Sequence, residues 1–75
     1  MFIQVYANAG RKKVSFTLVN GGQRIFGRDC DGGGWHTHPF DAPDAHNFEG
    51  EAGKAVALTD FLFEVEDILL SHGMI

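Results

Sequence analysis

Two histidines, His36 and His38, stand one residue apart in the segment 34–39. Side chains alternate between the two faces of an extended strand, so both imidazoles are expected to point the same way. Two imidazoles on one face can share a proton-transfer task or bind one metal ion. A third histidine, His46, follows after a turn-rich stretch. No other segment of the chain concentrates reactive side chains in this way.

A glycine-rich turn at 32–34 separates the histidine pair from the preceding predicted strand. In one register of that hairpin, Arg28 faces His36 and Phe26 faces His38 on the same side of the sheet. A permanent cation beside an imidazole lowers its pKa and prepares it to act as a base. A slip of one residue would place Arg28 and His36 on opposite faces and remove this site.

The first interpretation of the cluster is metal-independent RNA cleavage. His36 and His38 would act as acid and base, while Arg28 would stabilise the charge that develops in the transition state. Asp29 would orient one of the imidazoles. No cofactor is expected under this interpretation.

A second interpretation is a metal site formed by His36, His38 and His46, with Asp41 or Asp44 as a carboxylate ligand. Imidazole and carboxylate suit zinc and other divalent transition metals such as Fe, Ni or Mn. In a third interpretation the histidines are structural, and the chain is a non-enzymatic module that dimerises through its sheet. The direction of His46 discriminates between the first two, because its convergence with the pair favours the metal.

The elements that must position these residues follow from hydrophobic periodicity. Four strands are predicted, over residues 2–7, 13–19, 23–29 and 34–40. A surface loop over 41–53 and a C-terminal helix over 57–72 complete the chain. The expected architecture is α+β: a four-stranded antiparallel meander packed against one C-terminal amphipathic helix, in a single domain spanning 1–75.

The alternation within these strands predicts their buried faces. Apolar residues of the second strand share one face, and Arg24, Phe26 and Arg28 are expected to share a face of the third. In the helix a buried stripe is predicted from the apolar spacing, with its members at Leu58, Phe61, Leu62, Val65, Ile68 and Leu69. Gly73 is placed to end the helix, with Ile75 as the apolar contact that follows such a cap.

Charge is distributed unevenly along the 75 residues, although the net charge is only −4. Residues 1–28 carry five cations and no acid, whereas residues 29–75 carry ten acids and one cation. The basic half suggests phosphate contacts, which would make RNA a partner, through Arg11, Lys12, Lys13 and Arg24. The acidic helix would suit a basic protein partner.

Other features bound the class of protein. No apolar run approaches the length of a membrane span, the start shows no signal-peptide pattern, and the single Cys30 cannot form an internal disulfide. A cytoplasmic location without a membrane partner is therefore expected. Phe63 and Leu70 lie off the helical stripe, so the chain has surplus apolar surface, and a homodimer is predicted.

Residues 24–70 resemble the TumE-type family of small toxins from prokaryotic toxin–antitoxin pairs. The resemblance rests on Asp29 after a strand, the His36-Thr37-His38 cluster and the amphipathic helix that follows. Gly27, Arg28 and Cys30 depart from the family's Arg-Tyr-Asp-Asn-like motif around Asp29. The resemblance implies a toxin that acts on RNA or a related translation target and is neutralised by a cognate antitoxin.

Overall fold

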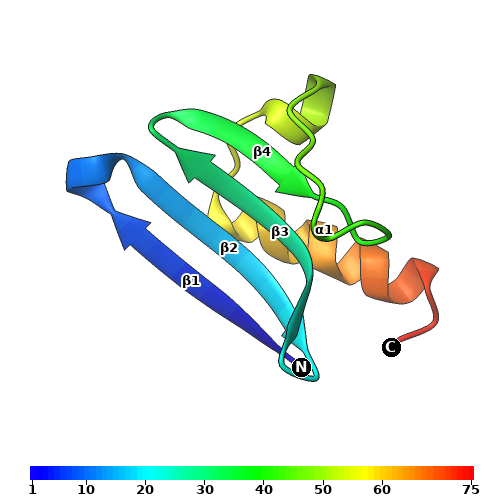
Figure 1. Ribbon diagram of the computed structural model, residues 1–75. Coiled ribbons are helices and arrows are strands. Elements are labelled where there is room, and N and C mark those ends of the chain that lie inside the picture. Colours follow the sequence, from blue (N-terminus) through cyan, green and yellow to red (C-terminus); the bar gives the residue numbers. More distant parts are fainter.

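A four-stranded antiparallel sheet with one helix packed against it forms the structure, a computed structural model that describes all residues 1–75 (Figure 1). The strands are adjacent in chain order: β1 (Phe2–Asn8), β2 (Lys13–Asn20), β3 (Gln23–Asp31) and β4 (Gly34–His38). The helix α1 spans Leu58–Ser71. The predicted α+β meander is thus confirmed. No helix reaches the length and apolarity needed to cross a membrane.

The turns explain most strand boundaries. Gly21 and Gly22 take positive φ between β2 and β3, a conformation that glycine adopts without steric cost. A short 3₁₀ turn, Ala9–Arg11, joins β1 to β2, and another, Gly50–Gly53 (η2), lies in the loop before α1. The strand predicted over 34–40 is shorter and ends at His38, because Pro39 has no N–H for a further ladder bond.

The core lies between α1 and one face of the sheet. Phe61 is fully buried, and its ring stacks against Phe26 with centroids 5.5 Å apart and packs on Phe16 at 5.6 Å. Val65 and Leu69 complete the buried stripe of α1 at the expected helical spacing. The sheet's other face is free of the helix.

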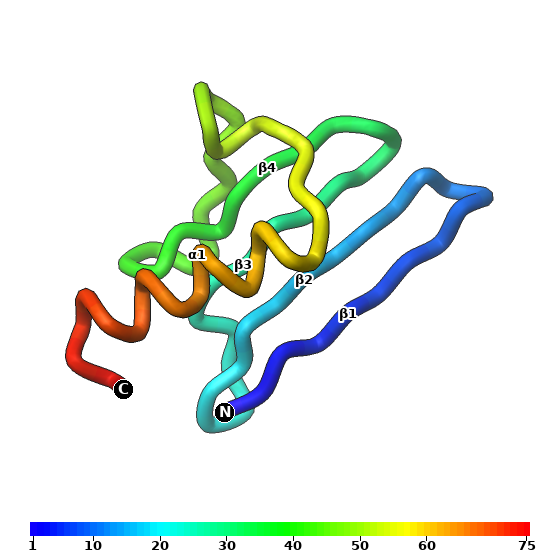
Figure 2. The backbone as a smooth tube through the Cα atoms, turned by 180° about the vertical axis from the view of Figure 1, so that it is seen from behind, coloured from blue at the N-terminus to red at the C-terminus, as the bar shows by residue number.

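The helix does not cover the whole sheet. Figure 2 shows α1 lying across the later strands, with β1 left uncovered at the edge. Two residues of the predicted stripe, Leu58 and Leu62, remain exposed. Phe63 and Leu70 are exposed as well, as their position off the stripe predicted.

Local hydrogen bonds define both ends of α1. The carboxylate of Asp60 accepts a bond from the backbone N–H of Ala57 at 2.8 Å and so fixes the first turn. At the other end Gly73 has φ 66°, and the N–H of Met74 donates to the carbonyl of Leu69 at 2.8 Å. This Schellman geometry places residue 74 over the core. The apolar contact after the cap is therefore Met74, and the expectation of Ile75 is wrong.

A β-bulge changes the faces of β3. Leu18 pairs with Phe26 but Val19 pairs with Arg24, so Ile25 is an extra residue without a partner. Ile25 packs against the core beside Phe26, and the Arg24 side chain emerges on the opposite, helix-free face. The expectation that Arg24 shares a face with Phe26 is wrong, because the bulge interrupts the alternation between them.

Candidate metal centre

The β3–β4 register decides which side chains meet. Asp29 pairs with His36 and Arg28 pairs with Thr37, one residue away from the predicted alignment. The predicted pairing of Arg28 with His36 is therefore wrong: Arg28 lies on the helix side of the sheet, and the imidazoles lie on the helix-free side. The two-residue turn at Gly32 and Gly33, both with positive φ, sets this alignment.

Arg28 has a structural role in place of the predicted catalytic one. Its side chain is buried and forms two hydrogen bonds with the carboxylate of Glu64 in α1, at 3.0 and 2.8 Å. It also donates to the carbonyls of Glu51 and Ala52 at 2.9 and 3.0 Å. The guanidinium thus ties η2 and α1 to the sheet, on the face away from the histidines.

The chain after β4 turns back and brings a third histidine to the pair. Thr37 and Asn47 exchange two backbone hydrogen bonds of 2.9 Å in an isolated antiparallel bridge. Residues on either side of such a bridge point to the other face, so His46 lies opposite His38 and Phe48 lies opposite His36. The ring centroids are 4.5 and 5.1 Å apart, respectively. His46 therefore converges with the pair.

Three atoms that can bind a metal ion form a small triangle. Nε2 of His36 lies 3.2 Å from Nε2 of His38, and Oδ2 of Asp29 lies 3.1 Å from Nε2 of His38 and 3.6 Å from Nε2 of His36. A ligand atom of His46 lies within 4.8 Å of those of the other two histidines. His36 and His38 are buried, whereas His46 is exposed.

A backbone carbonyl fixes the orientation of His38. Its Nδ1 lies 2.9 Å from the oxygen of Pro43. A carbonyl only accepts hydrogen bonds, so Nδ1 carries a proton and Nε2 is the ring nitrogen directed toward Asp29. A proton on Nε2 or a metal ion between the two atoms would satisfy this contact with the carboxylate. A carbonyl on the remote ring nitrogen is also the usual support of a metal-bound histidine.

Burial favours the neutral state of His36. Desolvation lowers the pKa of His36 below 6.5, the neighbouring His38 and His46 lower it further, and Asp29 partly opposes them. A neutral imidazole is the form that binds metal ions. The local electrostatics therefore keep at least one ligand ready at neutral pH.

The dimensions of the triangle fit a transition-metal ion. Two imidazole nitrogens bound to tetrahedral zinc at 2.0–2.1 Å lie about 3.3 Å apart, close to the separation found between His36 and His38. Two histidines and one carboxylate also form the donor set of many iron sites. The carboxylate that contacts the imidazoles is Asp29, rather than the predicted Asp41 or Asp44. From the sequence, Asp29 was expected beside the histidines only as a group that orients an imidazole.

Hydroxyl groups support the carboxylate from the same face of the sheet. The Ser15 hydroxyl donates to Oδ1 of Asp29 at 2.8 Å. Its oxygen lies 3.2 Å from that of Thr17, and because the Ser15 proton is already used, the Thr17 hydroxyl donates to Ser15. Arg24 lies 3.9 Å from Oδ2 of Asp29, and its Nε is buried without a hydrogen-bond partner. Oδ1 of Asp29 is thus occupied, and Oδ2 faces the imidazoles.

The predicted phosphate-contacting residues occupy different places. Lys13 and Arg24 line a hollow of about 240 Å³ together with the three histidines and Asp29. Arg11 and Lys13 line a neighbouring hollow over β1 and β2. Lys12, at φ 52° in the β1–β2 turn, lines neither.

Comparison with known proteins adds no relative. Neither a protein-family model, nor a curated protein sequence, nor a solved structure matches the chain.

Proposed function

We propose that the protein binds a divalent transition-metal ion, with zinc as the best match to the donor set. His36, His38 and Asp29 would supply three ligands from two adjacent strands, and His46 the fourth from the returning loop. The observation that carries this proposal is the convergence of Nε2 of His36, Nε2 of His38 and Oδ2 of Asp29 within 3.6 Å of one another. With both Nε2 atoms unprotonated these groups are electron-pair donors, and a cation at their centre satisfies all of them.

The surroundings favour a site used for chemistry. The three sheet ligands sit on paired strands, where the backbone ladder limits their movement. The fourth, His46, is exposed beside an open hollow, so it can be replaced by another ligand. A metal ion held there would act as a Lewis acid and lower the pKa of a bound water.

Zinc titration of the whole chain tests the proposal. Calorimetry on the chelator-treated protein should give one zinc per chain, and elemental analysis after dialysis should recover it. His38→Ala should weaken zinc binding by more than about 100-fold, since ligand loss costs more than loss of a supporting group. His72→Ala is the matched control, because His72 packs on Phe40 and donates to the Ile68 carbonyl instead. Equal affinities of the two variants would refute the site.

Metal-independent RNA cleavage, with the TumE-type resemblance behind it, is the second candidate. The close approach of His36 and His38 favours it, since a base and an acid are needed side by side. Lys13 and Arg24 would supply the cation in place of Arg28. RNA degradation that persists in a chelator and disappears in His36→Ala would support this candidate; sensitivity to the chelator would refute it.

A further inference from the structure

A second polar hollow adjoins the candidate metal centre on the helix-free face. Its volume is about 410 Å³, within the range of small-molecule sites, and β1, β2 and the turn between them form most of its wall. Lys13 and Asp29 line both this hollow and the histidine hollow. The two hollows are therefore neighbours, separated only by these shared side chains, and a ligand in the second would lie beside the first.

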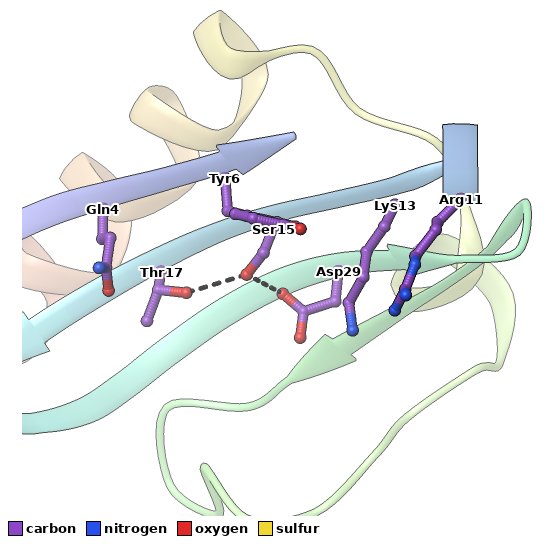
Figure 3. A pocket seen from close by; sticks show the side chains of 7 residues that line it. All are labelled: Gln4, Tyr6, Arg11, Lys13, Ser15, Thr17 and Asp29. Atoms are coloured by element: carbon purple, nitrogen blue, oxygen red, sulfur yellow. Dashed lines mark hydrogen bonds between the residues drawn. The ribbon is translucent and has the colours of Figure 1, made fainter. Parts of the chain in front are cut away.

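Two cations in this hollow have no counter-ion. Figure 3 shows Arg11 and Lys13 side by side, their tips pointing toward Asp29. Neither forms an ion pair, and neither side chain donates a hydrogen bond within the protein. Asp29 is the only acid that lines the hollow, and its oxygens already face Ser15 and His38.

The remaining polar groups on this surface include further donors. The Tyr6 hydroxyl accepts a hydrogen bond from Asn8 at 3.4 Å, so its own proton is free. The amide of Gln4 forms no internal hydrogen bond and points into the same hollow (Figure 3). The hydroxyls of Thr17 and Ser15 are instead used in the chain of hydrogen bonds that ends at Asp29. The surface thus offers positive charge and free donors.

We infer that this hollow binds the phosphate group of a substrate whose reacting end reaches the metal centre. Two adjacent cations match a doubly charged phosphate better than a singly charged carboxylate, and the Arg11 guanidinium can donate two parallel hydrogen bonds to it. The Tyr6 hydroxyl supplies a neutral donor to the same group. The inference rests on the proposed metal site for the substrate's orientation, but the phosphate subsite consists of separate residues.

Titration of the isotope-labelled whole chain by NMR tests the subsite. Inorganic phosphate, adenosine 5′-monophosphate and a short 5′-phosphorylated oligonucleotide are added separately to the metal-free and the zinc-loaded protein. Backbone amides of residues 11–17 should shift on binding. Equal affinity for phosphate and the monophosphate indicates that the phosphate alone is recognised. Tighter binding of the oligonucleotide identifies a nucleic-acid end as the source.

Charge-matched variants make the test specific. Arg11→Gln should weaken phosphate binding about tenfold, the effect of one charge-assisted hydrogen bond, and should leave the zinc stoichiometry at one. Lys12→Gln removes the same charge from a residue outside the hollow and should have little effect. Equal losses in the two variants, or shifts that avoid residues 11–17, would overturn the inference. Phosphate binding without zinc binding would retain the subsite and refute the metal centre.

Discussion

Oδ2 of Asp29 lies 3.1 Å from Nε2 of His38, although these residues are not partners in the β3–β4 register. The partner of His38 is Gly27, which has no side chain, so the carboxylate reaches the imidazole diagonally. Asp29 meanwhile faces His36 directly. One acid thereby contacts both histidines, and this makes it the centre of the candidate site.

Replacing Asp29 by an amide of the same size should weaken metal binding without leaving a cavity. Asp29→Asn retains the shape but loses the negative charge, so zinc affinity should fall by more than about 100-fold, as for loss of any ligand. Ser15→Ala removes only the hydroxyl that holds Oδ1, and should cost about tenfold. Calorimetric titration of the two variants measures the difference. A larger effect of Ser15→Ala than of Asp29→Asn would contradict the assignment of Asp29 as a ligand.

Removing the buried guanidinium should affect stability rather than metal binding. Arg28→Met removes the guanidinium that pairs with the Glu64 carboxylate and one of the donors to the Glu51 and Ala52 carbonyls, and should lower the free energy of unfolding by about 3 kcal/mol. Urea denaturation measures this loss. Zinc stoichiometry should stay at that of the wild type, since Arg28 lies on the opposite face. Lost zinc binding with unchanged stability would contradict this structural role.

The folded protein should lose stability in mild acid because of His36. Burial lowers its pKa below 6.5, so the unfolded chain binds a proton more readily than the folded chain. The free energy of unfolding of the metal-free protein should therefore decline as the pH falls from 6.5 through the lower pKa of the folded state. Urea titrations between pH 5 and about 8 test this. His36→Gln should flatten the decline, whereas a profile unchanged by this substitution would contradict it.

The packing of α1 should depend on one aromatic ring. Phe61→Ala removes a fully buried side chain between Phe16 and Phe26, and should cost about 3–5 kcal/mol. Phe63→Ala makes the same chemical change at a residue that is 70% exposed, and should change stability by less than about 0.5 kcal/mol. Thermal or urea denaturation compares them. Similar losses would show that α1 packs through a different face.

Local sequence patterns were enough to predict the strands, the turns and the helix of this protein. Alternation identifies β2, glycine pairs locate the turns that flank β3, and the spacing of Phe61, Val65 and Leu69 identifies the buried face of α1. These features depend on neighbours in the chain, through side-chain periodicity and allowed φ. The histidine pair likewise shares a face because both residues lie in one strand.

The composition of the site depended on pairings that local patterns do not determine. A one-residue difference in register moved Arg28 to the core side and brought Asp29 to the imidazoles, since every side chain changes face with such a slip. The bulge at Ile25 brought Arg24 to the same face. The bridge between Thr37 and Asn47 then placed His46 against His38.

The sequence by itself therefore determined the meander, the helix and the presence of two imidazoles on one face. Only the tertiary structure decided that an acid, and not an arginine, completes the group, and that a third histidine joins it from a loop. The physical reason is that backbone hydrogen bonds form equally well in neighbouring registers, and the packing of both faces selects among them. The residues that carry the proposed chemistry are thus chosen by contacts distant in the chain.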